Sequence, residues 1–433
     1  MAHPKPTTED LFSLRRYPNQ PDFVFHIPPA ERRKINYSKI KLLWAYHLFK
    51  FQYFTFEIAS NIFYSLTKKQ LDRKWFMTNV GSRNFPFSEY PKPFKSRTKF
   101  FYINKLFWSW VLEHLAEIEE YQTSIKETTD YEGSPFTIRA NKMRSGKPSR
   151  ITEHDYKTRL LVSQIVRELI SKCDKEVTAL SLNIHYFFPS DKTHLTFAVP
   201  DCILFTPDDM FLIEYDNRTE TQPRLLSKIL RYADSPFFRN TTIYFSFNVA
   251  DTVVLSKRIK NFSQNVAFRT TTNGRVFERL VDNGVRVYAL PEKNTVSQIA
   301  YSLFDKIVGR VRYPVDVKPL YKTVLGQYYH LTIKVAPKGD YFDYYATGTD
   351  DDFQEVTIPL LYMEYGLVGN ELLLQQIAEK VGDTYKHIGL LIEGKIDDQV
   401  YQFDDKRFVA IYLERVAKRL ILTKKGEWKE LRQ

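Results

Sequence analysis

Residues 200–221 read PDCILFTPDDMFLIEYDNRTET, and two apolar runs in this stretch are each joined to an acidic residue. Asp201 opens the first run, Glu214 follows the second, and Asp216 comes two positions later. Short apolar runs on either side of a polar turn predict the two strands of a hairpin. Neighbouring strands lie about 4.8 Å apart, so an acid on each strand can face the same ion. We therefore expect the carboxylates of Asp201 and Glu214 to lie within about 6 Å of each other.

The acidic residues at these strand ends are candidates for a metal site. Mg²⁺ and Mn²⁺ prefer carboxylate and water oxygens, so Asp201, Glu214 and Asp216 are the candidate ligands. A metal held there lowers the pKa of a bound water and offsets negative charge on a phosphodiester, which is the chemistry of a nuclease. The alternative interpretation is that these acids are ordinary strand ends without a catalytic role.

The expected metal site lacks a lysine where one is usually found. A Pro-Asp pair, a spacer and Glu214 form a pattern typical of metal-dependent nucleases, which add a lysine two positions after the glutamate. Asp216 occupies that position here and cannot supply a positive charge. We predict that Lys228 supplies it, because it borders the apolar stripe of a predicted helix over 222–233 and can reach back over the strand ends. Asp216 is then either a third acidic ligand or the mark of a site that no longer cuts.

The acidic hairpin lies in a segment, residues 151–310, that is predicted to have an α-β-β-β-α-β order and to form one mixed α/β domain. Thr152 is expected to cap a long helix, which carries Glu168, a further candidate acid, on the border of its apolar stripe. His154, near the start of this helix, either binds substrate phosphate or is a surface or capping group. The other expected elements are strands within 177–188, 195–205, 210–215 and 242–249, a strand at GVRVYALP, and helices over 222–233 and 295–308.

Residues 38–125 have the predicted order helix, helix, basic helix and β-ribbon, which is the order of a winged helix-turn-helix domain. Thr55 is a candidate N-cap of the second helix, and Thr67 with Gln70 has capping-box spacing at the start of the third. Basic side chains on the third helix and the ribbon predict contacts to the DNA major groove and backbone, the alternative being a solvated basic face. They are Lys68, Lys69, Arg73, Lys74, Arg83, Lys95, Arg97 and Lys99.

The remaining segments complete a multidomain α/β and α+β organisation. Residues 1–37 are rich in proline and charge and predict an extended arm, whereas the polar residues 126–150 predict a linker. Residues 311–433 are predicted to form a separate C-terminal α+β domain, with β-prone runs such as EVTIPLLYM and a helix over 370–381. The residue chemistry of this last domain indicates no function.

Composition narrows the class of partner. The 433 residues carry a formal net charge of +12, which favours a polyanion such as nucleic acid, the alternative being a basic soluble protein. There is no phosphate-binding Gly-x-x-x-x-Gly-Lys-Ser/Thr loop, which argues against an ATP-driven motor. There is also no His-hydrophobe-His pair, which argues against a tyrosine relaxase, whose metal is bound by paired histidines. Two cysteines exclude a zinc ribbon. No signal-peptide pattern and no apolar run of about 18 residues occur, so we expect a cytoplasmic protein without membrane contact.

The stretch VPDCILF…FLIEYDNRTETQPRLLSKILRYA resembles the replication-relaxation family of plasmids and mobile elements, and the resemblance covers about residues 40–310. It implies a winged helix followed by a PD-(D/E)XK nuclease-like domain. It also implies binding to double-stranded DNA, at a plasmid or mobile-element origin, in replication, relaxation or transfer. A homodimer is one assembly that such a role allows. Two classes stay open, which are a Mg²⁺- or Mn²⁺-dependent endonuclease and a non-catalytic initiator or accessory protein. The matching residues are Pro200, Asp201, Glu214, Asp216, Arg218, Thr219, Glu220, Lys228, Tyr232 and His154.

Overall fold

The structure is a computed structural model of the whole chain. Within the part that it describes, no helix combines the length and the apolar character needed to cross a membrane. The described residues are 23–26, 34–37, 44–45, 48, 51, 53–80, 87–91, 93–94, 98–104, 150–172, 181–183, 200–205, 210–218, 220–234, 238–307, 332–349, 355–393, 405, 407–414, 419–424 and 427–430.

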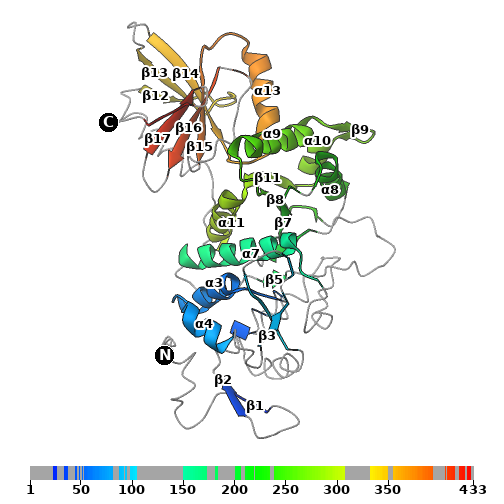
Figure 1. Cartoon of the computed structure of the whole chain (residues 1–433). Helices are drawn as coiled ribbons and strands as arrows, with labels where there is room; N and C mark the ends of the chain where they lie inside the picture. Colours follow the sequence, from blue (N-terminus) through cyan, green and yellow to red (C-terminus); the bar gives the residue numbers. More distant parts are fainter. Residues whose placement is uncertain are drawn as a thin grey trace. The chain divides into compact units, whose positions relative to one another are not determined.

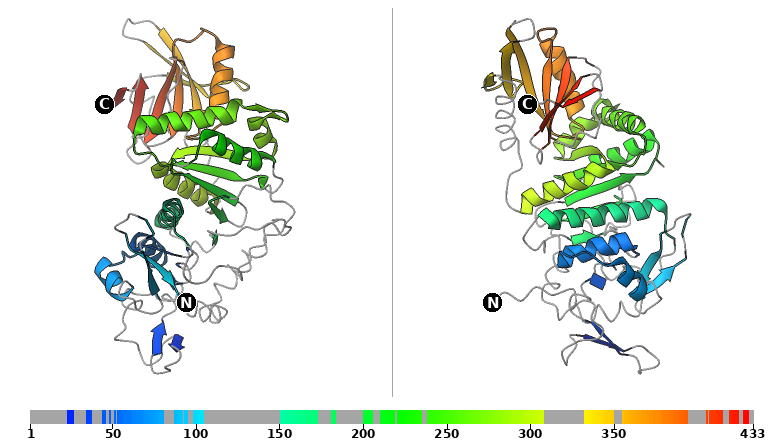
Figure 2. Two further views of the ribbon diagram at one scale, coloured as in Figure 1. Left: turned by 45° about the vertical axis from the view of Figure 1, so that its right-hand side comes forward. Right: turned by 60° about the vertical axis from the view of Figure 1, so that its left-hand side comes forward.

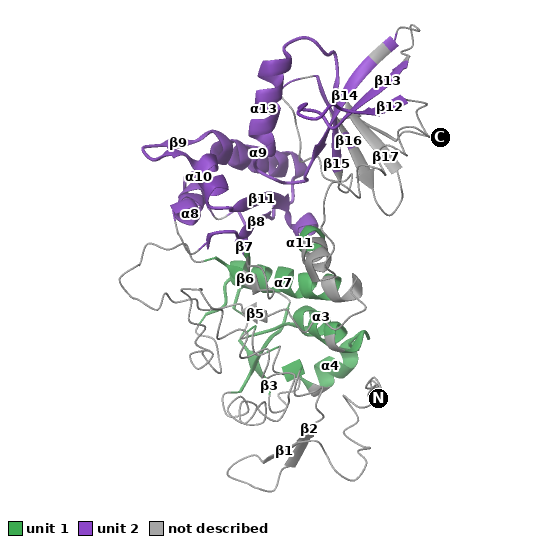
Figure 3. Cartoon of the chain, turned by 180° about the vertical axis from the view of Figure 1, so that it is seen from behind, with its two compact units in different colours: residues 1–195, 199–212, 296–304 green, residues 196–198, 213–295, 305–433 purple. Residues whose placement is uncertain are grey.

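The chain divides into two compact units, shown in different colours in Figure 3, and helices and strands occur in both. The predicted mixture of α and β structure is therefore confirmed. The expected boundary between residues 310 and 311 falls inside unit 2, and the expected boundary at residue 150 falls inside unit 1. Unit 1 comprises residues 1–195, 199–212 and 296–304, and unit 2 comprises residues 196–198, 213–295 and 305–433.

The N-terminal part of unit 1 contains short helices and two antiparallel ribbons (Figure 1). One ribbon lies within the segment expected to be an extended arm, and the other is the ribbon expected after the basic helix. The expected linker over 126–150 lies outside the described residues except for its last residue, Arg150. The elements are β1 (Phe23–His26), β2 (Lys34–Tyr37), α3 (Phe56–Thr67), α4 (Arg73–Asn79), β3 (Phe87–Tyr90) and β4 (Phe100–Ile103).

The boundary between α3 and α4 differs from the prediction. Thr55 caps α3 as expected, its hydroxyl accepting a hydrogen bond from the backbone N–H of Ile58 at 3.5 Å. The capping box predicted at Thr67 is wrong, because Thr67 is the last residue of α3 and Lys68 ends that helix in the left-handed conformation. Asp72 caps α4 instead, and a carboxylate is among the strongest N-cap groups. The basic segment is therefore a turn followed by a short helix.

Aromatic side chains form the core beneath α3, α4 and the second ribbon. Phe54 pairs with Phe101 of β4 through two backbone hydrogen bonds of 2.8 and 2.9 Å, which tie the segment before α3 to the ribbon. Phe76 of α4 meets Phe101 edge-on with ring centroids 5.4 Å apart, and Trp44 meets Phe87 of β3 at 5.9 Å. All five side chains are almost fully buried. This packing fixes the helices relative to the ribbon.

The long helix α7 (Glu153–Lys172) packs against α3 within unit 1. Its start is capped as predicted, since the Thr152 hydroxyl accepts a hydrogen bond from the Asp155 N–H at 3.0 Å. The contact with α3 is polar as well as apolar, because Asn61 donates to the Ser163 hydroxyl at 2.9 Å. The buried guanidinium of Arg159 donates to the Phe51 carbonyl at 2.8 Å. The first α7 turns thus belong to the same core as the helices before them.

Two short strands also belong to unit 1. They are β5 (Ser181–Asn183) and β6 (Cys202–Phe205), which run antiparallel with Leu182 opposite Leu204. The first residues of β7 (Met210–Asp216), up to Leu212, also belong to this unit and lie beside β6, as expected for a hairpin.

In unit 2 the last residues of β7 adjoin an α/β core. β8 lies between β7 and β11 in the sheet, and β8 pairs with β11 in parallel, with Phe245 opposite Ala289. Figures 1 and 2 show the helices on the faces of these strands, and α9 packs against β11. The elements are α8 (Gln222–Asp234), β8 (Thr242–Phe247), α9 (Thr252–Phe268), β9 (Thr270–Thr271), β10 (Gly274–Arg275), α10 (Val276–Asp282) and β11 (Arg286–Pro291). The next helix, α11 (Glu292–Ile307), begins in unit 2, but its residues 296–304 belong to unit 1.

The C-terminal part of unit 2 is a seven-stranded sheet whose strands follow chain order. β14, β15 and β16 pair in parallel, and the other neighbours are antiparallel. α13 (Asn370–Val381) occupies the predicted range and packs against α9. The strands are β12 (Thr332–Val335), β13 (Tyr344–Thr349), β14 (Glu355–Met363), β15 (Ile388–Glu393), β16 (Phe408–Glu414), β17 (Arg419–Lys424) and β18 (Glu427–Glu430).

The segment that links β14 to α13 is joined closely to β11. Backbone hydrogen bonds connect Ala289 to Gly366 at 2.8 Å and Val368 to Val287 at 3.0 Å. Gly366 has a φ of +80°, and a Cβ there would lie 2.2 Å from Leu290 Cδ2, so only glycine fits this contact. The C-terminal sheet and the α/β core therefore share one interface inside unit 2.

A hydrogen-bonded carboxylate strengthens this interface. The Glu364 carboxylate accepts from Arg286 at 2.5 Å and from the Tyr288 hydroxyl. The Tyr288 ring also stacks on Tyr244 with centroids 4.9 Å apart. Burial, with the negative charge of Glu364 beside it, raises the pKa of Tyr288 well above its ordinary value. Tyr288 therefore stays protonated and donates to Glu364 across the neutral pH range.

Candidate functional site

The acidic end of β7 places two carboxylates inside unit 2. Glu214 and Asp216 are two residues apart and so lie on the same face of the strand, and each residue is only 1% exposed. The three apolar residues directly before Glu214 on β7 are buried in the core, so the two acids follow directly on a core segment of the strand. Burying an unpaired carboxylate is costly, so the fold has to supply cations or hydrogen-bond donors around both acids.

Helix α8 supplies the groups that contact Glu214. Lys228 Nζ lies 2.7 Å from Glu214 Oε2 and 3.1 Å from Glu220 Oε1, and the Tyr232 hydroxyl donates to Glu214 Oε1. Lys228 and Tyr232 are four residues apart and therefore share one side of the helix. Leu225 and Ile229 fix that side against the core. The structure thus brings the sequence-predicted Lys228, Tyr232 and Glu214 together.

A second cation, which the sequence reasoning missed, comes from α9. Arg258 Nε donates to Asp216 Oδ2, and another guanidinium nitrogen of Arg258 donates to the Glu220 carbonyl. Gln222 also donates to the Arg258 carbonyl at 3.2 Å, so the turn before α8 is held to α9 on both sides. No motif spacing links Arg258 to the acidic strand. The only signal was the general need of a buried acid for a cation.

The acidic cluster, defined as Glu214, Asp216 and Glu220, keeps two oxygen atoms without hydrogen-bond partners. They are Asp216 Oδ1 and Glu220 Oε2, and both are buried. With Lys228 and Arg258 the formal charge of the group is −1. Hard carboxylate oxygens and residual negative charge suit Mg²⁺ or Mn²⁺. Among the described residues, however, no group of three or more His, Cys, Asp or Glu side chains is arranged to hold a metal ion.

The opposite face of β7 is also polar at its end. The Tyr215 hydroxyl donates to Glu292 at 2.9 Å and accepts from the Asn248 side chain at 2.7 Å. The Asn248 backbone N–H donates to the Asp216 carbonyl at 2.9 Å. These bonds fix the backbone of the strand end from behind, and so help to hold the two acidic side chains on the other face in place.

The predicted ligand Asp201 lies in unit 1, immediately before β6. His154 Nε2, in the first turn of α7, is 3.4 Å from Asp201 Oδ2, and their side chains are 26% and 19% exposed. Two residues that the sequence singled out separately are therefore partners. Glu168 is half-buried on the same helix, α7. Glu214 belongs to the other unit, so the expected separation of the Asp201 and Glu214 carboxylates stays a prediction.

The basic side chains expected to contact DNA divide between a turn, a helix and the ribbon. Lys68 and Lys69 are exposed in the turn before α4, whereas Arg73 and Lys74 are exposed in its first turn. The prediction that all four share one helix is wrong, because the Asp72 cap starts α4 later. Arg73 lies over the Phe56 ring at 5.3 Å, and Lys99 pairs with Glu89 at 3.5 Å. Arg83, Lys95 and Arg97 lie outside the described residues.

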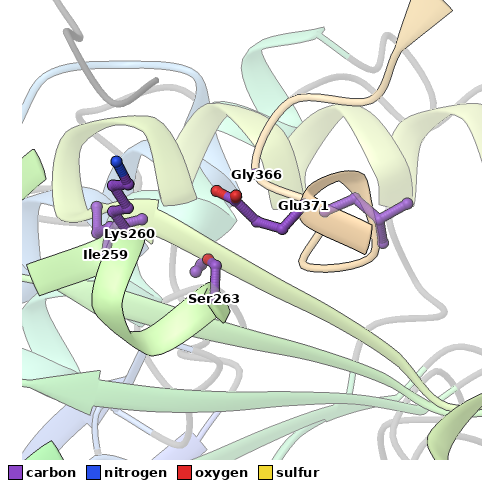
Figure 4. A pocket seen from close by; sticks show the side chains of 7 residues that line it. Ile259, Lys260, Ser263, Gly366 and Glu371 are labelled. Carbon is purple, nitrogen blue, oxygen red and sulfur yellow. The ribbon is translucent and has the colours of Figure 1, made fainter. Parts of the chain in front are cut away.

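A small hollow lies between α9, β11 and the segment before α13 (Figure 4). Its lining includes Ile259, Lys260, Ser263, Gly366 and Glu371. The volume is about 10 Å³, which is room for one water molecule. The hollow belongs to the interface between the α/β core and the C-terminal sheet, and it is too small for a substrate.

Comparison of the chain with models of known protein families gave no match, and comparison with curated proteins gave no significant match either.

Proposed function

We propose that the protein binds double-stranded DNA of a plasmid or mobile element, in replication, relaxation or transfer. Its α/β core acts as a PD-(D/E)XK-like, metal-dependent endonuclease centre. The observation that carries the proposal is the contact of Lys228 Nζ with Glu214 Oε2 at 2.7 Å. A nuclease strand of this type needs a cation beside its glutamate, and α8 supplies one where position 216 has an aspartate.

Asp216 and Glu220 are the residues that would hold Mg²⁺ in unit 2, through the two oxygens that have no hydrogen-bond partner. Asp201 stays the ligand predicted from the sequence. When bound, the metal ion would lower the pKa of a coordinated water and offset charge on the phosphodiester. Lys228 contributes a positive charge next to the acids, where it can stabilise negative charge that develops on a phosphate oxygen. Tyr232 and Arg258 orient the carboxylates of Glu214 and Asp216.

The DNA-reading role is proposed for the N-terminal part of unit 1. The order α3, turn, α4 and ribbon supports a winged-helix role for this part, with α4 proposed as the helix that enters the major groove. Exposed Lys69 lies in the turn before α4, and exposed Arg73 and Lys74 lie in its first turn. The start of this helix is the end that contacts base edges and phosphates in helix-turn-helix proteins. These cations supply the salt-dependent part of the affinity.

A cleavage assay on supercoiled plasmid tests the catalytic proposal. Wild-type protein is expected to nick or linearise the plasmid with Mg²⁺ or Mn²⁺ and to be inactive in EDTA. Glu214→Gln keeps the shape of the side chain but removes its charge, so cleavage is expected to stop while DNA binding in EDTA continues. Wild-type protein that leaves the plasmid intact with Mg²⁺, Mn²⁺, Ca²⁺ and Co²⁺ would overturn the catalytic proposal.

A second candidate function is a non-catalytic DNA-binding protein that keeps the nuclease-like core as a scaffold. The burial of Glu214 and Asp216 favours it, since the pairing of Asp216 with Arg258 already neutralises a carboxylate that a metal would need. Binding of Mn²⁺, followed by the loss of its free electron paramagnetic resonance signal, separates the two functions. Binding that is lost in Asp216→Asn supports the endonuclease. Equal signals for both proteins support the scaffold.

A further inference from the structure

Three exposed arginines border the acidic cluster of unit 2. Arg218 lies in the turn between β7 and α8, and Arg224 and Arg231 lie on α8 itself. We call these three residues the arginine strip. In the part of the chain that the structure describes, none of the three guanidiniums is paired with a carboxylate. Their charges therefore face solvent beside a cluster whose own charges are mostly buried.

Helical spacing explains why the strip lies along the site. Arg224, Lys228 and Arg231 follow one another at intervals of four and three residues, so they share one side of α8. The middle member, Lys228, reaches Glu214 and Glu220. The outer two members stay exposed on either side of it. Any polyanion that approaches Lys228 therefore meets these two arginines as well.

Arg218 extends the strip beyond the start of α8. Its backbone has a φ of +61°, a left-handed conformation that is uncommon for arginine. The turn that follows is held by the bond from Arg258 to the Glu220 carbonyl and by the bond from the Arg224 N–H to the Thr221 carbonyl at 3.0 Å. The fold thus keeps an unusual backbone conformation at a position that carries an exposed cation. Such conformations concentrate at functional sites.

The formal charges of this region indicate which kind of ligand the arginine strip binds. The acidic cluster together with Lys228 and Arg258 has a formal charge of −1, which repels a phosphate. The strip adds three positive charges, so the region as a whole becomes attractive to a polyanion. Arg224 and Arg231 are about 10.5 Å apart along the helix axis. One DNA strand carries a phosphate for about every 3.4 Å of rise, so arginines at this separation can contact different phosphates of the same backbone.

We propose that the arginine strip Arg218, Arg224 and Arg231 binds the phosphate backbone of duplex DNA and positions it at the acidic cluster. This inference rests on the proposed function, because it takes DNA as the partner of that site. It adds a second DNA-contacting surface, in unit 2, to the winged helix of unit 1. The strip positions DNA and takes no part in bond cleavage.

The test measures DNA binding in EDTA, where no cleavage occurs. Fluorescence anisotropy of a labelled duplex gives the association constant of the full chain over a range of salt concentrations. The variant Arg218→Gln/Arg224→Gln/Arg231→Gln is expected to lower the slope of log K against log salt by about 2.7, at roughly 0.9 for each phosphate contact. The matched control carries Lys334→Gln, Lys338→Gln and Lys386→Gln, three exposed lysines of the C-terminal part of the same unit.

The control is expected to keep the wild-type slope, so a fall confined to the strip variant supports the proposal. Equal slopes for the strip variant and the wild type would overturn it. If the triple variant fails to fold by circular dichroism, Arg224→Gln/Arg231→Gln leaves the Arg218 turn intact and should lower the slope by about 1.8. The strip and the endonuclease can fail separately. If the strip variant has a lower salt slope but the wild type never cuts DNA, only the catalytic proposal is overturned. If the strip variant keeps the wild-type slope and the wild type cuts normally, only the proposal for the arginine strip is overturned.

Discussion

Replacing Lys228 by methionine tests the pair that defines the candidate site. The Glu214 side chain is 2% exposed and that of Lys228 is 20% exposed, so the carboxylate is buried and the lysine is largely shielded from water. Methionine keeps much of the side-chain volume but leaves the Glu214 carboxylate buried without a cation. Removing one partner of a buried pair costs about 3–5 kcal/mol. We expect the lower end, about 3 kcal/mol, because the Tyr232 hydroxyl still donates to Glu214.

Calorimetry of the full chain measures this cost. For a unit of 150–250 residues, 1 kcal/mol lowers Tm by about 2–4 °C, so the Lys228→Met transition of unit 2 should fall by about 6–12 °C. The double variant Glu214→Gln/Lys228→Met removes both charges and is expected to recover most of the loss. Lys257→Met, at an exposed position on α9, is the control and should stay within about 0.5 kcal/mol of wild type. The reasoning is refuted if Lys228→Met and Lys257→Met have the same Tm, or if the double variant is no more stable than Lys228→Met.

Three further predictions concern the interface in unit 2 and the DNA reader. Gly366→Ala should destabilise unit 2 by more than Gly339→Ala, because both glycines have positive φ but only a Cβ at Gly366 meets a neighbouring side chain; equal losses in Tm would contradict this packing. Tyr288→Phe should cost about 1.5–3 kcal/mol at neutral pH, from the lost bond to a charged group. The folded state raises the pKa of Tyr288, so its stabilisation is present below about pH 10 and is lost as the pH rises further. The Tm of the wild type should therefore fall more than the Tm of the variant between about pH 9 and 11. Lys69→Ala/Arg73→Ala should lower the salt slope of DNA binding by about 1.8, and an unchanged slope would remove α4 and its preceding turn from the interface.

Local patterns in the sequence predicted much of the secondary structure. The helix over 370–381, the caps at Thr55 and Thr152, and the strand that carries Glu214 all follow from signals within a few residues of each other. The error at Thr67 is also local, because two capping signals lie five residues apart and the Asp72 carboxylate forms the cap. Propensity alone does not decide between such neighbours.

Contacts distant in sequence were the part that patterns did not predict. Arg258 reaches Asp216 from another helix, and the pairing of His154 with Asp201 joins residues on separate elements. The interface at Gly366 was missed because a single glycine in a loop carries no sign of what it packs against. Lys228 was predictable because helical spacing fixed it beside the apolar stripe of α8. The sequence therefore predicted the part of the candidate site that lies on β7 and α8, but not the part that α9 contributes.

The central claim is that Lys228 supplies the cation of an endonuclease centre built on β7 and α8. Single-turnover cleavage of supercoiled plasmid with Mg²⁺ or Mn²⁺ tests it most directly, at a temperature where Lys228→Met and the surface control Lys334→Met are both folded. Removing one group that stabilises transition-state charge typically slows an enzyme by about 10²–10³-fold. We therefore predict a loss of at least about 100-fold for Lys228→Met, with unchanged DNA binding in EDTA and a wild-type rate for the control. Equal rates for the two variants, or a wild type that does not cut with either metal, would contradict the account.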